Sequence, residues 1–183
     1  MTAVSHRLRK SSRTKKIMAA VTGLVGLTCA ALVTTNAAGA GETPSQHCTK
    51  NVSNDEQKCF ATYERAKQYA AQEIKDGADS AQTRVEKSSD VVIGTLFTGK
   101  RYGGDTLTLW GSRPCHRNGK ADFYFNLPEK FQNNLSSFQG WAECDIVLHA
   151  EPYLAGESSE RFKGLTPKVS EQWNDRAQSV EFR

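Results

Sequence analysis

An eight-residue pattern that occurs twice in the C-terminal half most constrains the fold of this chain. The two copies are residues 131–138 (FQNNLSSF) and residues 173–180 (WNDRAQSV). Each copy starts with an aromatic residue, continues with two amide or acid residues, and ends with a serine and an apolar residue. An internal repeat of this kind predicts a duplicated structural unit.

A glycine precedes each copy at a matching place. Gly104 lies two residues after Tyr102 and seven after Phe97. The same spacing recurs before the second copy, at His149, Leu154 and Gly156. A glycine here favours a positive φ or the close approach of another segment, and a hairpin folded onto its own sheet needs both. We therefore expect Tyr102 to pack beside Phe97.

The serine near the end of each copy, Ser137 or Ser179, is expected to be structural. Buried polar groups in folded proteins are nearly always paired, and a folded hairpin offers backbone groups as partners. These two hydroxyls are therefore expected to fasten the hairpins and to take no part in catalysis.

These positions together resemble the βγ-crystallin Greek key, whose signature is an aromatic, a second aromatic five residues on, a glycine two further and a late serine. The resemblance covers residues 91–183, about half of the chain, and extends to secreted bacterial members of the family. It implies a mostly β fold in which two Greek keys form a β-sandwich, preceded by a small disulfide hairpin and a helix.

Strands are expected where apolar and polar residues alternate between turn signals. The expected strands are residues 91–97, 106–109, 123–125, 137–141, 146–149, 159–162 and 179–182. In the first strand, the residues expected to face one way are Val91, Ile93, Thr95 and Phe97.

The N-terminus is expected to be a signal peptide, residues 1–40. Residues 1–16 contain six lysine or arginine residues and no acid, residues 17–33 are uncharged, and Ala38-Gly39-Ala40 is a small-x-small cleavage site. The alternative is an uncleaved membrane anchor, because the uncharged stretch is nearly long enough to span a bilayer. We expect a secreted protein with no membrane contact after cleavage.

The net charge changes when this leader is removed. The whole chain has 24 lysine and arginine residues and 20 acidic residues, and the leader holds six of the basic ones, which leaves 18 against 20. The excess of positive charge is thus a targeting property, and it gives no support for a nucleic-acid partner.

Four cysteines remain after the leader, and none forms a CxxC pair. In an oxidising compartment an even number of cysteines predicts disulfides. Three connectivities are open, and we favour Cys48 with Cys59 and Cys115 with Cys144, because each pair closes a loop within one region. Residues 41–58 are then a disulfide-closed hairpin or loop.

A helix is predicted for residues 61–76, with Thr62 as its N-cap and Gly77 as its stop. Its apolar stripe consists of Tyr63, Ala66, Tyr69, Ala70 and Ile74. Packing of this stripe on the hairpin or on the β domain is one interpretation, and an unknown protein partner is the other. Residues 77–90 are polar and are predicted to be a linker to a domain at residues 91–183.

The repeat also resembles the calcium motif of microbial βγ-crystallins, which is N/D-N/D-x-x-S/T-S. The resemblance implies oxygen ligands from both copies, namely Gln132, Asn133, Ser136 and Ser137 in the first and Asn174, Asp175, Gln178 and Ser179 in the second. Gln132 and Gln178 depart from the motif, and Asp175 is the only acid among these positions. Calcium binding is thus expected to be weak, with a Kd of roughly 10⁻⁴ to 10⁻³ M, or absent. The alternative is that these are polar turns kept for the fold.

No enzyme motif is found: the chain has no GxSxG, HExxH or phosphate-binding loop. His149 is expected to pack where the family has an aromatic residue. The expected function is that of a secreted, non-catalytic binding or structural protein, monomeric, with calcium as its one candidate ligand. The resemblance also implies an alternative, a protease inhibitor or killer-toxin-like effector, whose candidate contact is the loop Gly111–Lys120 around Cys115.

Overall fold

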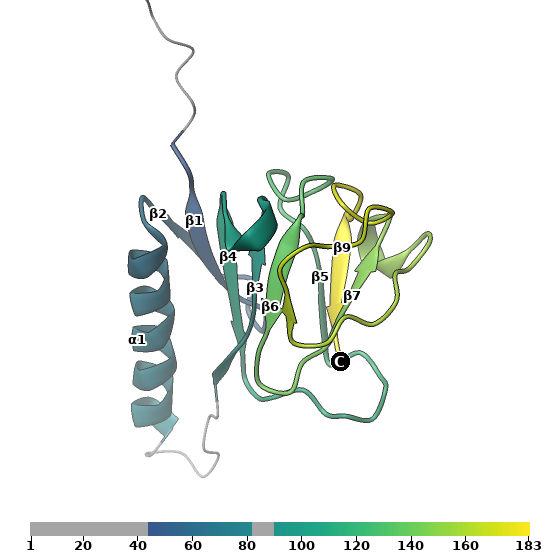
Figure 1. Cartoon of the computed structure of the whole chain (residues 1–183). Coiled ribbons are helices and arrows are strands. Elements are labelled where there is room, and N and C mark those ends of the chain that lie inside the picture. The colour runs from purple at the N-terminus through teal and green to yellow at the C-terminus, as the bar shows by residue number, and fades with distance from the viewer. Residues whose placement is uncertain (1–43, 82–89) are drawn as a thin grey trace, which may run out of the picture. The chain divides into compact units, whose positions relative to one another are not determined.

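The computed structural model describes residues 44–81 and 90–183. The predicted signal peptide and most of the predicted linker lie outside these residues. The elements in chain order are β1 (His47–Asn51), β2 (Gln57–Phe60), α1 (Tyr63–Ala81), β3 (Val91–Phe97), η1 (Lys100–Tyr102), β4 (Thr106–Gly111), β5 (Phe123–Asn126), β6 (Ser137–Gly140), β7 (Ile146–His149), η2 (Pro152–Leu154), β8 (Leu165–Thr166) and β9 (Ser179–Phe182) (Figure 1). In this part of the chain, no helix has the length and apolar character needed to cross a membrane.

The strands form two sheets. One has the order β2-β1-β4-β3-β6-β8 and the other the order β5-β9-β7. The core fills the space between the sheets, with Leu107 and Phe138 from the first sheet and Phe125 and Val180 from the second. At Gly94 the sheets approach so closely that a Cβ atom would lie 2.6 Å from the ring of Phe182. The prediction of a mostly β sandwich is therefore confirmed.

Most of the expected strands form, and β3, β7 and β9 have the expected bounds. The strand expected at residues 159–162 is wrong, because this segment makes only the isolated bridge Ile146–Phe162, and a second bridge, His149–Ser158, lies just before it. The hydroxyl of Ser159 accepts the Leu148 N–H at 2.9 Å. A side chain thus replaces the backbone carbonyl that a continuous ladder would require there.

The faces of β3 differ from the prediction because the strand has a bulge. The register with β4 shifts between Val92 and Gly94. Ile93 and Leu96 both lie in the core between the sheets, whereas Thr95 lies in a pocket on the opposite face, beside α1. An extra residue in one strand moves all later side chains to the other face. Val91, Ile93, Thr95 and Phe97 therefore do not share one face.

The N-terminal hairpin joins the larger sheet. β1 pairs with β2 in antiparallel register, with Cys48 opposite Cys59, and these two cysteines form a disulfide. β1 also pairs in parallel with β4, from His47 opposite Thr106 to Asn51 opposite Trp110. The disulfide hairpin is thus confirmed, and its pairing with β4 was not predicted.

The helix α1 begins at Tyr63, where the N–H of Arg65 donates to the hydroxyl of Thr62 at 3.4 Å. It continues through Gly77 to Ala81, so the predicted stop is wrong. A glycine inside a helix costs only about 1 kcal/mol relative to alanine, and here a Cβ would lie 3.3 Å from the carboxylate of Asp90. The glycine therefore gives room to the chain that enters β3.

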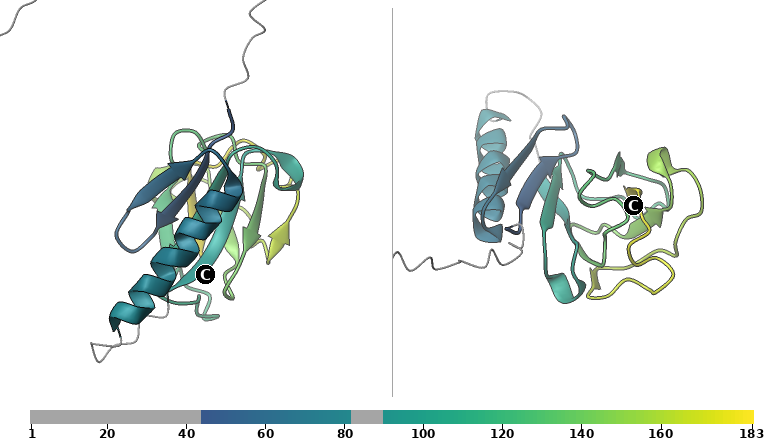
Figure 2. Two further views of the ribbon diagram at one scale, coloured as in Figure 1. Left: turned by 90° about the vertical axis from the view of Figure 1, so that its left-hand side faces the viewer. Right: turned by 90° about the horizontal axis from the view of Figure 1, so that it is seen from above.

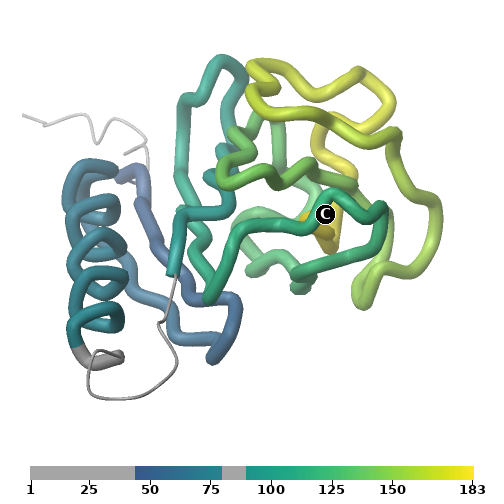
Figure 3. The backbone as a smooth tube through the Cα atoms, turned by 90° about the horizontal axis from the view of Figure 1, so that it is seen from below, coloured from purple at the N-terminus to yellow at the C-terminus, as the bar shows by residue number. Residues whose placement is uncertain are grey.

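The apolar stripe of α1 packs on the protein's own sheet. Ala66 and Ala70 are fully buried, and α1 contacts β1, β2 and β4. Figures 2 and 3 show the helix lying along the outer face of the hairpin. This confirms the packing interpretation of the stripe.

Candidate metal site between the repeated loops

The first folded hairpin, between β3 and β4, is fastened by Ser137 at the start of β6. The Ser137 hydroxyl donates to the Gly99 carbonyl at 2.6 Å and accepts the Tyr102 N–H at 3.0 Å. The Tyr102 ring lies 5.5 Å from the ring of Phe97 between centroids. Gly104 has a φ of +77°, the conformation expected from its place in the repeat.

The second hairpin, after β7, is fastened in the same way. The Ser179 hydroxyl donates to the Glu151 carbonyl at 2.6 Å and accepts the Leu154 N–H at 3.1 Å. Gly156 has a φ of +72°. The two hairpins share further left-handed residues at equivalent places, which are Arg101, Tyr102, Tyr153 and Leu154. The two folded hairpins therefore have the same backbone conformation.

The repeated loops 131–138 and 173–180 lie against each other and exchange backbone hydrogen bonds. The N–H of Asn133 donates to the carbonyl of Ala177 at 2.8 Å, and the N–H of Asp175 donates to that of Leu135 at 3.2 Å. Asn133 and Asp175 both have positive φ, of 52° and 57°. The donors are thus equivalent residues of the two copies, so the exchange is reciprocal.

This crossing brings oxygen atoms of different copies together. The Ser136 hydroxyl of the first copy donates to one Asp175 carboxylate oxygen at 3.3 Å. The Asn174 side-chain N–H donates to the other carboxylate oxygen at 2.5 Å. The Asn174 side-chain oxygen is buried and has no hydrogen-bond partner among the described residues. Sequence reasoning grouped these ligands copy by copy, whereas the structure combines Ser136 with Asp175.

The equivalent place on the other side of the crossing has a weaker donor set. Asn133 and Gln178 are the repeat equivalents of Asp175 and Ser136, so this place has no carboxylate from either position. Gln132, the first residue that departs from the motif, donates its side-chain N–H to the Leu127 carbonyl at 2.8 Å. Gln178 accepts the Leu127 N–H at its backbone carbonyl, at 2.9 Å. The Gln132 side chain therefore holds the segment after β5, and Gln178 holds the same segment through its backbone.

The chemistry of the first donor set suits calcium. Calcium takes hard oxygen ligands from carboxylates, amides and carbonyls. Asp175, Ser136 and Asn174 supply a carboxylate, a hydroxyl and an amide oxygen that lacks a partner. Among the described residues, no group of three or more His, Cys, Asp or Glu side chains could hold a metal. A site at this crossing would therefore depend on neutral oxygens around one carboxylate.

A second polar cluster anchors the loop Gly111–Lys120. Asp122 pairs with Arg113 at 2.5 Å and with the His116 ring at 2.7 Å, and its carboxylate also accepts the His116 N–H. Burial raises the pKa of Asp122, but the hydrogen bonds from His116 and Arg113 outweigh it and hold this pKa below its usual value. The Cys115–Cys144 disulfide, as predicted, fixes the same loop.

A third cluster lies on the smaller sheet, where His149 packs against Glu181 rather than against apolar side chains alone. His149 Nε2 lies 3.3 Å from the Glu181 carboxylate, and Arg183 also pairs with Glu181. Glu181 is buried between apolar neighbours in β9, so the strand pattern alone gave no sign of this acid. Glu181 is thus a buried carboxylate with two partners, the Arg183 guanidinium and the His149 ring, as buried polar groups require.

Residues 91–183 thus have a βγ-crystallin-like fold of two Greek keys, each closed by a serine, with one candidate metal site where their loops cross. No protein-family model matches the chain, and no curated protein sequence matches it.

Solved structures similar to this chain include a βγ-crystallin domain from Clostridium beijerinckii (16% identity, TM-score 0.39, covering 49% of this chain and 95% of that one). Another is a βγ-crystallin domain from Flavobacterium johnsoniae (16% identity, TM-score 0.38, 50% and 93% covered). A third is the N-terminal domain of protein S (14% identity, TM-score 0.38, 50% and 94% covered). Because these overall similarities are low, the fold assignment depends on the chain's own paired hairpins and serines.

Proposed function

We propose that this chain is a secreted, non-catalytic βγ-crystallin-type protein with one weak calcium site at the crossing of its repeated loops. The observation that supports the site is the meeting of the Ser136 hydroxyl with the Asp175 carboxylate, beside the unpartnered oxygen of Asn174. Secretion is supported by the two disulfides, because such bonds persist in oxidising compartments.

The expected effect of calcium is to hold the two repeats together. Ser136 belongs to the loop before β6, and Asp175 belongs to the loop before β9. An ion held by both loops binds the folded chain and not the unfolded one, so it adds stability by mass action. At a free calcium concentration ten times the Kd, this gain is about 1.4 kcal/mol.

We expect 10 mM calcium chloride to raise the melting temperature of the purified protein by a few degrees, and magnesium chloride to raise it much less. Asp175→Asn is expected to abolish the calcium effect, because it removes the only charged ligand while asparagine tolerates the same positive φ. The measurement is thermal unfolding followed by circular dichroism.

Asp55→Asn is the matched control, since Asp55 is also an exposed turn aspartate with a positive φ, of 63°. This variant should keep the full calcium response. If the wild-type melting temperature does not move in calcium, or if Asp175→Asn responds like the wild type, the proposed site is wrong.

Protease inhibition is the second candidate function, and the anchored loop Gly111–Lys120 favours it. The tip of this loop, residues 116–120, is exposed, while the loop base is fixed by the Cys115 disulfide and by the ion pair of Arg113 with Asp122. A rigid exposed loop loses little entropy on binding. We expect deletion of residues 117–119 to abolish inhibition of secreted proteases in a peptide-hydrolysis assay, and no inhibition by the intact protein would eliminate this candidate.

A further inference from the structure

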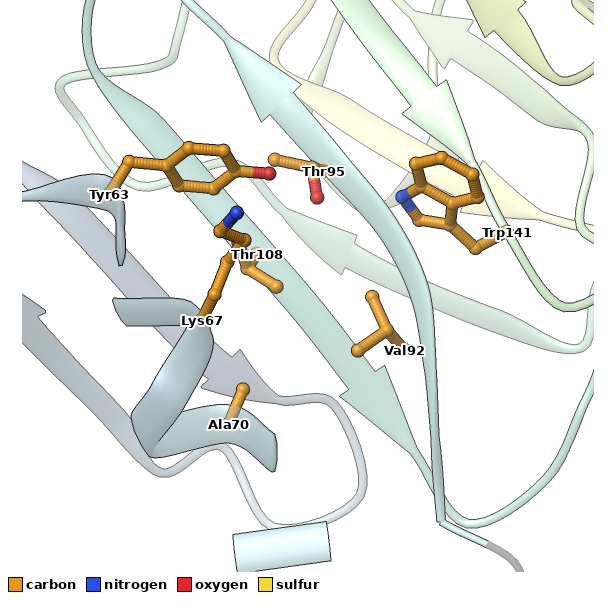
Figure 4. A pocket seen from close by; sticks show the side chains of 7 residues that line it. All are labelled: Tyr63, Lys67, Ala70, Val92, Thr95, Thr108 and Trp141. Atoms are coloured by element: carbon orange, nitrogen blue, oxygen red, sulfur yellow. The ribbon is translucent and has the colours of Figure 1, made fainter. Parts of the chain in front are cut away.

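A pocket with a volume of about 440 Å³ lies between α1 and the outer face of the larger sheet, away from the loop crossing. Figure 4 shows its lining, in which Tyr63 and Lys67 come from α1, Thr108 from β4, Thr95 from β3, and Trp141 from the residue after β6. The volume falls in the range of small-molecule sites. The lining is mostly apolar, so an occupant would be mainly apolar too.

The floor of this pocket contains a buried hydroxyl without a partner. Thr108 is 2% exposed, lines the pocket, and its hydroxyl has no hydrogen bond among the described residues. The hydroxyl of Thr49, opposite Thr108 on β1, and the indole N–H of Trp110, two residues along β4, also have none. These are three of the five such atoms in the part of the chain that the structure describes. Of these three residues only Thr108 lines the pocket. Buried polar groups are rarely left unpaired, so the Thr108 hydroxyl points to a polar group of a ligand.

The neighbouring threonine on the same strand shows the contrast. Thr106 is also 2% exposed, but its hydroxyl lies 3.1 Å from the ring nitrogen of His47. Thr106 and Thr108 therefore differ in hydrogen bonding and not in burial, and only Thr108 lines the pocket.

A positive charge lies at the side of the pocket. The Lys67 ammonium is 4.7 Å from the centroid of the Tyr63 ring and pairs with Glu64 at 2.8 Å. An ammonium has three donors, so one pairing leaves capacity for a further acceptor. Trp141, 42% exposed, supplies an indole on the other side of the pocket (Figure 4).

We propose that this pocket binds a small aromatic carboxylate. The carboxylate accepts hydrogen bonds from the Lys67 ammonium and, once the buried Thr108 side chain turns about its Cα–Cβ bond, from the Thr108 hydroxyl. The ring packs between Tyr63 and Trp141. A carboxylate fits because the Lys67 ammonium and the hydroxyls of the lining residues Tyr63, Thr95 and Thr108 can all donate. An aromatic ring fits because the rest of the lining is apolar and partly aromatic. This site is separate from the calcium crossing and does not depend on it.

The test uses 4-phenylbutyrate as the probe, with 4-phenylbutanol and 4-phenylbutylamine as controls that keep the apolar body and change the head group. By isothermal titration calorimetry, we expect 4-phenylbutyrate to bind with a Kd on the order of 10⁻⁴ M, and each control at least about tenfold more weakly. In the NMR spectrum, the indole N–H signal of Trp141 should shift on binding, and that of the core residue Trp173 should not.

Thr108→Val is expected to weaken 4-phenylbutyrate binding about tenfold while leaving the melting temperature of the free protein unchanged or higher, because no internal hydrogen bond is lost. Thr106→Val, the matched control, should lower the melting temperature and keep the affinity. Lys67→Met should weaken the carboxylate about tenfold and leave the alcohol unaffected. Equal binding of the three probes, no binding at millimolar concentration, or an unchanged affinity of Thr108→Val would each overturn the proposal.

Discussion

Trp173→Ala is expected to lower the free energy of unfolding by about 4 kcal/mol, because the largest fully buried side chain among the described residues is then replaced by a cavity. Trp173 is 1% exposed and opens the second repeated loop, where the guanidinium of Arg176 lies 5.0 Å from its ring. The substitution therefore removes core contacts and also the ring that holds the loop with Asp175 in position. Urea unfolding followed by far-UV circular dichroism measures it.

Trp141→Ala is the matched control for this substitution. Trp141 is 42% exposed and follows the equivalent region of the first repeat, so its loss should cost less than about 1.5 kcal/mol. Similar losses for the two variants would mean that Trp173 does not fill the core between the sheets.

The second large effect is expected for the double variant Ser137→Ala, Ser179→Ala, at about 4 kcal/mol, with about 2 kcal/mol from each single change. Both serines are fully buried, and each hydroxyl pairs with one carbonyl and one N–H of a folded hairpin. Removing a hydroxyl leaves these backbone groups without a partner, which costs more than the bond itself gained. Urea titrations of the single and double variants give the three values.

The two single losses should add to within about 0.5 kcal/mol, since Ser137 lies in β6 of one sheet and Ser179 in β9 of the other. Ser45→Ala, at an exposed serine before β1, is the control and should change stability by less than about 0.5 kcal/mol. A loss confined to one of the two serine variants would show that the two hairpins are not equivalent.

Much of the fold could be predicted because the repeat contains residues that allow few backbone conformations or few hydrogen-bond partners. Gly104 and Gly156 have positive φ, and the buried hydroxyls of Ser137 and Ser179 need hydrogen-bond partners. A folded hairpin provides the glycine conformation and the partners in each repeat. The disulfides also followed from spacing, since pairing within each region closes two short loops.

Long-range pairings could not be predicted in the same way. The parallel pairing of β1 with β4 joins segments that are 59 residues apart, and no local pattern encodes it. The bulge at Ile93 reversed the later faces of β3. The adjacent Gly94 is a signal of such a bulge, which the prediction of a regular strand overlooked.

The arrangement of the candidate calcium ligands could not be predicted from the sequence. Asp175 and Ser136 belong to copies that are about 40 residues apart, and they meet only because the repeated loops cross. The pocket beside α1 was missed altogether, because Lys67 and Thr108 have no shared motif and are brought together by the docking of the helix.

The hairpin β1–β2 also determines which strand ends the larger sheet. Without it, the leucine-rich strand β4 would present its free backbone groups to solvent, and such an edge is a template for pairing with another molecule. With it, the outermost strand is the short β2, which contains Lys58 and is held in place by the Cys48–Cys59 bond. We therefore expect reduction of this bond to weaken the protection against aggregation along that side of the protein.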